Sequence, residues 1–200
     1  MEIINIQAQN PDKEKTARAI EVLKQGGIVL YPTDTIYGLG VDINNENAIK
    51  KLYSLKKRPF NKPVSICISD VAEMSKFAHI NPGIQKTVSK LLPGPFTIIL
   101  KKKSSISSLL TAGSEKIGIR IPDINLCHDL CLEFPITSTS ANISGLNPEK
   151  SIEGIRYQLG DKIDLILNAG PLKNNQPSTV IDFTLNPPQI LRQGAGKYLI

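Results

Sequence analysis

The chain has 200 residues, of which 40% are hydrophobic and 21% charged, as in an ordinary globular protein that can bury a sizeable core. The net charge is +6, and this excess suits an anionic ligand, an anionic partner such as RNA, or both. Trp is absent and aromatic residues make up only 5%, which argues against a platform that stacks the bases of single-stranded nucleic acid.

No segment signals export or a membrane crossing. Residues 1–5 lack a basic stretch followed by an apolar run, and no apolar stretch approaches about 18 residues. Cys67, Cys127 and Cys131 are odd in number and lack CxxC spacing, and only His128 lies near the last two. We therefore expect a cytoplasmic protein with reduced thiols, no membrane contact and no metal site formed by side chains.

Helices and strands alternate along the first 70 residues. A short strand is predicted at 3–7, then a helix that begins near Asn10-Pro11-Asp12 and ends at Gly26-Gly27, then a buried strand at 28–31. The segment 32–40 follows this strand and contains hydroxyls, one acid and glycines, which suits a ligand-binding loop as well as an ordinary turn. A helix over 45–57 and a strand over 64–68 come next.

The segment 56–63 is the first candidate binding element because it is rich in cations and follows a helix end. Pro59 and Pro63 disfavour helical geometry at Arg58 and Lys62, so both cations are expected on a stiff, non-helical segment. Four extended residues span roughly 13 Å, which lets these two side chains hold different parts of one long anion. A solvated basic loop is the alternative interpretation.

The remaining elements are short and interleaved. Helices are predicted near 70–78, 82–92, 124–133 and 151–159, and strands near 96–101, 117–121, 165–167, 179–183 and 189–192. Extended geometry over 135–145 would place Ser138, Ser140, Asn142 and Ser144 on one face, where neutral donors can hold phosphate or ribose. With no internal repeat or low-complexity linker, the pattern predicts one α/β domain of two or three layers with a mixed sheet.

Several common catalytic signatures are missing. The sequence has no GxxxxGK[ST] and no GxGxxG, so neither usual nucleotide-binding loop is available. His79 and His128 lie in no recognisable triad context, which gives little support to covalent catalysis. An enzyme built from these residues would work by positioning anions and stabilising their charge.

Five sequence blocks together resemble the YrdC/Sua5 family of threonylcarbamoyl-AMP synthases. They are Gly27–Leu39, Lys56-x-Arg58, Ser140-x-Asn142, Ser178-Thr179-Val180 and Leu191-Arg192-x-Gly194. The resemblance covers nearly the whole chain in order. It implies a single YrdC-like domain over residues 1–200, with a twisted, open mixed sheet and flanking helices around a large concave basic cleft.

The resemblance also implies an activity. Members of this family combine L-threonine, bicarbonate or CO2, and ATP, with Mg2+ bound through the ATP phosphates. They release pyrophosphate and L-threonylcarbamoyladenylate, which serves the N6-threonylcarbamoyladenosine modification of tRNA. The implied partners are tRNA-modification proteins, and weak binding of tRNA or double-stranded RNA is expected. The competing hypothesis is a non-catalytic RNA-binding or ribosome-maturation factor that uses the same basic cleft.

The family motifs assign roles to individual positions of this sequence. Lys56 and Arg58 would be catalytic, with Lys56 helping to neutralise the triphosphate. The implied threonine contacts are Thr35, Cys67, Arg120, Ser138 and Ser178. The implied ATP contacts are Arg58, Lys62, Ser140, Asn142 and Arg192. Many relatives carry His at the position of Cys67, and the chain ends soon after Arg192, as in the short, single-domain type.

Overall fold

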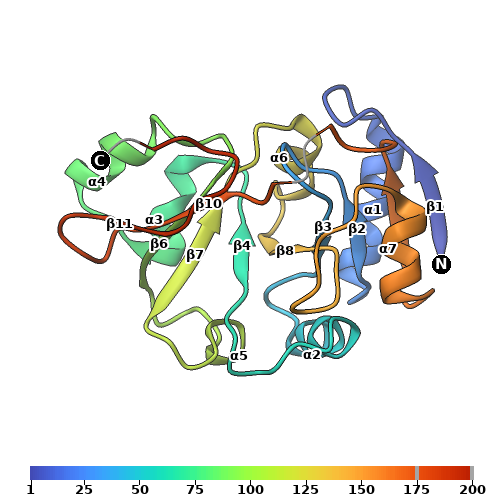
Figure 1. Cartoon of the computed structure of the whole chain (residues 1–200), viewed down its shortest axis with the longest axis horizontal. Coiled ribbons are helices and arrows are strands. Elements are labelled where there is room, and N and C mark those ends of the chain that lie inside the picture. The colour runs from blue at the N-terminus through green and yellow to red at the C-terminus, as the bar shows by residue number, and fades with distance from the viewer. Residues whose placement is uncertain (174–175, 199–200) are drawn as a thin grey trace.

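The computed structural model describes residues 1–173 and 176–198, which form one mixed sheet with helices packed against it (Figure 1). The strands are β1 (Glu2–Asn5), β2 (Val29–Tyr31), β3 (Gly38–Gly40), β4 (Ser65–Cys67), β5 (Ala78–His79), β6 (Phe96–Lys102), β7 (Lys116–Arg120), β8 (Ile136–Ser140), β9 (Leu165–Asn168), β10 (Thr179–Asp182) and β11 (Gln189–Arg192). The helices are α1 (Lys13–Lys24), α2 (Glu46–Leu55), α3 (Met74–Phe77), α4 (Pro82–Val88), α5 (Ser108–Thr111), α6 (Asn125–Leu130), α7 (Ile152–Leu159) and a short 3₁₀ helix, η1 (Val71–Glu73).

The strand order is β1-β9-β2-β3-β8-β4-β7-β6-β10-β11, with β5 added beside β6. The sheet contains parallel pairs such as β4–β7 and antiparallel pairs such as β3–β8, and the two edge strands, β1 and β11, do not meet. The sequence-based prediction of an α/β protein with an open mixed sheet is therefore confirmed. Strand β8 joins the two halves of the sheet, since it pairs with β3 on one side and β4 on the other.

Local sequence signals explain where the longer helices begin and end. The Asp12 carboxylate accepts hydrogen bonds from the backbone N–H groups of Glu14 and Lys15, both at 3.0 Å, and so caps α1. The chain leaves this helix through Gly26, whose φ of +76° suits glycine. Asn45 caps α2 in the same way, accepting from Ala48 N at 3.1 Å.

The two faces of the sheet are covered unequally. The larger apolar core lies on one face, where α2 and α7 pack against side chains such as Leu39, Ile66 and Ile119. On the opposite face, α1 and α6 form a second core with residues such as Tyr31 and Cys67. The part of this second face that α1 and α6 leave open carries small and polar side chains, and it forms the floor of a cleft.

Three details of the fold differ from the sequence-based expectations. Strand β3 lies inside the segment predicted as a loop, because Gly38 and Leu39 pair with β2 and β8 although glycine has low strand propensity. The helix predicted over 82–92 ends at Val88, and the short elements α5 and β5 were not predicted.

Within residues 1–173 and 176–198, no helix has the length and apolar character that a membrane crossing requires.

Candidate active site

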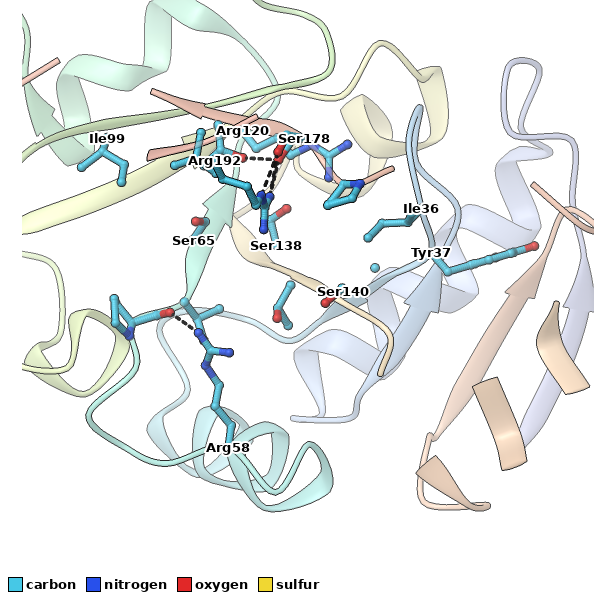
Figure 2. Close-up of a pocket in the computed structure, with 17 residues that line it drawn as sticks. Ile36, Tyr37, Arg58, Ser65, Ile99, Arg120, Ser138, Ser140, Ser178 and Arg192 are labelled. Atoms are coloured by element: carbon cyan, nitrogen blue, oxygen red, sulfur yellow. Dashed lines mark hydrogen bonds between the residues drawn. The ribbon is translucent and has the colours of Figure 1, made fainter. Parts of the chain in front are cut away.

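A cleft of about 290 Å³ opens over the uncovered part of the sheet (Figure 2). Its charged lining residues are all arginines, namely Arg58, Arg120 and Arg192. Its serine and threonine lining residues are Ser65, Thr97, Ser138, Thr139, Ser140 and Ser178. Arg120 and Arg192 lie together at one side, and Arg58 reaches in from the opposite side, with Ser138 and Ser140 between them (Figure 2).

The floor of the cleft is shallow because neighbouring strands place small residues next to one another. Gly38 of β3 is paired with Ser140 of β8, and Ser138 is paired with Ser65 of β4. On the next strand, a Cβ atom at Gly118 would overlap Ser65 Oγ. Any larger side chain in this row would fill the space that a ligand needs.

Arg120 is held by the segment that follows β2. Its Nη2 donates to Asp34 Oδ1 at 2.5 Å, to Thr33 Oγ1 at 3.2 Å and to Thr35 Oγ1. The ion pair with Asp34 is almost fully enclosed, since the two side chains are only 7% and 12% exposed. Arg120 lines the cleft, whereas its Nε is buried and forms no hydrogen bond within the described residues.

Arg192 and Ser178 form a second rigid unit at the cleft. Arg192 donates to the carbonyl oxygen of Ser178 through Nε at 3.1 Å and through Nη2 at 2.8 Å. Gly194 has no side chain to obstruct this contact, since a Cβ there would overlap the carbonyl oxygen of Pro177. Burial, and secondarily the nearby Arg120 charge, lower the pKa of Arg192, although a guanidinium remains charged at neutral pH.

The segment after α2 is a turn, so the expected non-helical geometry is confirmed, although Arg58 and Lys62 do not lie along a fully extended stretch. Lys62 N donates to Pro59 O at 3.1 Å, and Arg58 Nε donates back to Lys62 O at 3.1 Å. Arg58 Nη2 also donates to Pro63 O at 2.7 Å. Tyr53 OH holds the same turn by donating to Lys62 O at 2.7 Å. The turn aims Arg58 into the cleft, while Lys62 is exposed outside the lining.

Lys56 occupies an unexpected place, because its side chain is 1% exposed and lies outside the cleft lining. Its Nζ donates to the carbonyl oxygen of Ser140, and to that of Asn142 at 2.7 Å. Its own carbonyl accepts from Ser144 N at 2.8 Å. Burial, and secondarily the positive charge of Arg58, lower the pKa of Lys56 to about 7. The lysine therefore connects the end of α2 to the segment after β8.

Asn142 lies in the turn that follows β8, since the strand ends at Ser140 and the row expected to continue to Ser144 is not extended. Its amide nitrogen donates to Ile143 O at 2.8 Å and to Leu146 O at 2.7 Å. Its Oδ1 is buried and has no hydrogen-bond partner within the described residues. The unpaired atom of Asn142 is thus an acceptor, and it is enclosed by the protein outside the cleft lining.

The structure separates the expected site residues into three groups. Six of them line the cleft: Arg58, Arg120, Ser138, Ser140, Ser178 and Arg192. Thr35 lies directly behind, bonded to Arg120, whereas Lys56, Lys62 and Asn142 stand outside the lining. Cys67 is fully buried in the second core with Cys127 and Cys131, so its thiol does not reach the cleft. Burial raises the pKa of Cys127 and Cys131, which keeps both as neutral thiols.

Sequence reasoning missed several cleft residues. Ser65 and Thr97 belong to segments that read simply as apolar strands, and Gly118, which leaves room for Ser65, resembles any glycine in a strand. The alternation of residues along 96–101 could have placed Thr97 on the face opposite Ile98. Which face carries the cleft could not be derived without knowing the strand order.

The lining contains no carboxylate among the described residues, and the nearby Asp34 is already paired with Arg120. No group of three or more potential metal-ligating side chains occurs within residues 1–173 and 176–198. Because Mg2+ prefers carboxylate and carbonyl oxygens, these side chains do not suit a magnesium ion held by the protein itself.

Comparison with known proteins gives a consistent assignment. The Sua5/YciO/YrdC family model, described as "Telomere recombination", matches residues 21–194. A Methanocaldococcus jannaschii protein named "Putative threonylcarbamoyl-AMP synthase" is 39% identical over 196 residues, covering 96% of this chain and 92% of its own length.

Two solved structures superpose closely. Sua5 from P. abyssi complexed with L-threonine matches with a TM-score of 0.90 and 32% identity, covering 97% of this chain and 58% of the Sua5 chain. YciO from E. coli also has a TM-score of 0.90, with 29% identity and 98% of both chains covered. From its fold and its sequence, the chain belongs to the Sua5/YciO/YrdC family.

Proposed function

We propose that this protein is a threonylcarbamoyl-AMP synthase, which forms L-threonylcarbamoyladenylate and pyrophosphate from L-threonine, bicarbonate or CO2, and ATP. Curated relatives that align with most of this chain bear that name. The observation that carries the proposal is the cleft itself, where three arginines and a row of hydroxyls converge without a competing carboxylate. Such a lining suits two anions that must be brought together.

The reaction needs anion positioning more than proton transfer by a side chain. The neutral amine of threonine adds to CO2 and releases a proton to solvent, which gives a carbamate. A carbamate oxygen then attacks the α-phosphorus of ATP, a P–O bond to the β-phosphate breaks, and pyrophosphate leaves. Both reactants are anionic, so arginines that neutralise their charges lower the barrier to their approach.

The placement of the arginines suggests how the substrates divide the cleft. Arg120 would bind the threonine carboxylate through its guanidinium, with Ser138 and Ser178 donating beside it. Arg58 would approach the phosphates from the opposite side of the cleft. Thr35 would act through Arg120, to which its hydroxyl is bonded. Lys62 and Asn142 would contact ATP only where it extends beyond the cleft lining.

Mg2+ is expected to enter with the nucleotide, bound through the ATP phosphates, because the lining side chains do not suit a resident ion. The product would serve the N6-threonylcarbamoyladenosine modification of tRNA, through partner proteins that transfer the threonylcarbamoyl group. Cytoplasmic location is part of the same proposal.

The activity is tested by pyrophosphate release from ATP, measured with threonine and bicarbonate present together and with each left out. The proposal expects release only in the complete mixture, together with a product that has the mass of threonylcarbamoyladenylate. Release that does not depend on threonine would contradict it.

Calorimetry separates the enzyme from an RNA-binding factor. ATP and threonine should bind without RNA, whereas a tRNA fragment should bind weakly and lose affinity steeply as salt rises. Tight, salt-resistant RNA binding with no detectable ATP binding would favour the RNA-binding hypothesis instead.

A further inference from the structure

Thr97 of β6 faces the cleft next to Ser178, on the same side of the sheet as Gly118 and Arg120. Its side chain is buried, and its hydroxyl lies 2.7 Å from Ser178 Oγ. The two residues are 81 positions apart in sequence, so the contact depends on the pairing of β6 with β10.

The surroundings of Ser178 fix its backbone independently of Thr97. Arg192 holds the carbonyl oxygen of Ser178 through two hydrogen bonds, and Ala195 N donates to Pro177 O at 2.9 Å. Gly194 packs against the same peptide. The neighbouring side chains therefore determine only the orientation of the Ser178 O–H group.

Two groups meet that hydroxyl. Arg192 Nη2 can only donate, and it lies 3.2 Å from Ser178 Oγ, so it occupies one lone pair. If Thr97 donates as well, both lone pairs are occupied and the Ser178 proton must point elsewhere. Ser178 lines the cleft, so a proton that points away from both donors can serve an anionic substrate there.

We propose that Thr97 is a positioning residue: its hydroxyl donates to Ser178 Oγ and thereby presents the Ser178 O–H to the carboxylate or carbamate of the amino-acid substrate. This inference rests on the proposed synthase function and identifies how one of its substrate contacts is oriented. Thr97 acts through Ser178 and makes no hydrogen bond to the substrate itself.

The test uses Thr97→Val, which keeps the shape of the side chain and removes the hydroxyl, together with Thr97→Ser, Ser178→Ala and the Thr97→Val/Ser178→Ala double variant. Thr87→Val on α4, outside the cleft lining, is the matched control. For each protein, thermal melting checks folding, and the steady-state KM for threonine, the KM for ATP and kcat are measured. Calorimetry gives the threonine affinity directly.

Thr97→Val should raise the KM for threonine roughly three- to tenfold, the effect of losing one hydrogen bond, with little change in the KM for ATP or in kcat. Thr97→Ser should recover most of the lost affinity. In the Ser178→Ala background, Thr97→Val should have no further effect, because a residue that acts only through Ser178 has nothing left to orient.

Three results would overturn the inference: an unchanged KM for threonine in Thr97→Val, equal increases in both KM values, or additive effects in the double variant. If Thr97→Val does not fold, the comparison of Thr97→Ser with Thr97→Ala by threonine calorimetry decides instead, and equal affinities would contradict the role. Failure of the wild-type protein to use threonine would refute the proposed function, which is a distinguishable outcome.

Discussion

Lys56 Nζ donates to the carbonyl oxygen of Asn142 at 2.7 Å, and this contact joins the Lys-x-Arg and Ser-x-Asn motifs, which are 86 residues apart in sequence. The motifs therefore form one structural unit before any ligand arrives. Arg58 faces the cleft, whereas Lys56 points into the protein and supports the segment that carries Ser140. Lys56 and Arg58, only two residues apart, thus have different surroundings and different expected roles.

Lys56→Met should weaken nucleotide binding by roughly tenfold or more, because two buried carbonyl oxygens lose their donor and the segment 140–142 can shift. If the lysine acts as a support, calorimetry should show similar losses for ATP and for AMP. A loss confined to ATP would show instead that the charge acts on the β- and γ-phosphates. Lys57→Met, at the exposed neighbouring position, is the control and should bind both nucleotides normally.

The same lysine makes stability depend on pH in a predictable direction. The pKa of Lys56 is lowered from 10.5 to about 7, so between these pH values the unfolded chain binds more protons than the folded chain. The free energy of unfolding should therefore rise with pH in this window. Below pH 7 Lys56 is charged in both the folded and the unfolded chain, and burial of its charge then lowers the stability most.

Urea denaturation at pH 7 and pH 9 tests this, with Lys56→Met as the reference. The wild-type protein should gain on the order of 2 kcal/mol more than the variant across that interval. Parallel pH profiles for the two proteins would mean that the Lys56 pKa is not lowered.

Asp34→Asn should reduce both threonine affinity and stability, because Arg120 loses the charged partner that holds it. Weakening an enclosed pair of this kind costs about 1–3 kcal/mol, and the KM for threonine should rise roughly tenfold. Asp161→Asn is a matched control, since it removes the carboxylate of an exposed pair with Arg156. That change should cost less than about 1 kcal/mol. Equal losses in the two variants would contradict the special role of the enclosed pair.

Gly118→Ala should impair the binding of both substrates, because the added methyl group would overlap Ser65 Oγ and lie 3.2 Å from Thr97 Cγ2. Combining it with Ser65→Gly should restore part of the affinity by making room on the floor of the cleft. Gly83→Ala in α4 is the control, since its nearest neighbour is the Asn81 side chain at 3.4 Å. Normal calorimetric binding by Gly118→Ala would contradict this, since it would show that Ser65 can move aside without any loss of substrate affinity.

Arg58→Lys should lower kcat/KM by roughly a hundredfold, about as much as Arg58→Ala. The guanidinium holds the carbonyl oxygens of Lys62 and Pro63 while it faces the cleft, and an ammonium cannot span these positions. Lys57→Ala removes a neighbouring exposed charge and should leave pyrophosphate release unchanged. Near-normal turnover in Arg58→Lys would favour the alternative interpretation, in which residues 56–63 form a solvated basic loop.

The sequence predicted the elements whose signals are local. Asp12 and Asn45 begin helices as expected, and the apolar runs at 28–31 and 117–121 form buried strands. Strand alternation places Arg120 on the face opposite Ile119, and the side chain does line the cleft.

What the sequence could not provide depends on contacts between distant segments. Lys56 and Lys57 are adjacent and chemically identical, yet one is buried because carbonyl groups beyond β8 receive its ammonium. Cys67 follows Ser65 on the same face of β4, but α6 covers it while Ser65 remains open to the cleft. The turn at 58–63 likewise depends on Tyr53 OH, which prolines alone did not reveal.

The position of β8 between β3 and β4 restricts how the site can change. Because side chains alternate along a strand, a slip of one residue in either pairing would turn Ser138 away from the cleft surface and bring Thr137 to it. The same slip would remove the buried bond from Thr137 Oγ1 to Leu39 O. New specificities in this scaffold should therefore arise by replacing side chains, whereas insertions and deletions should accumulate in the connections outside these three strands.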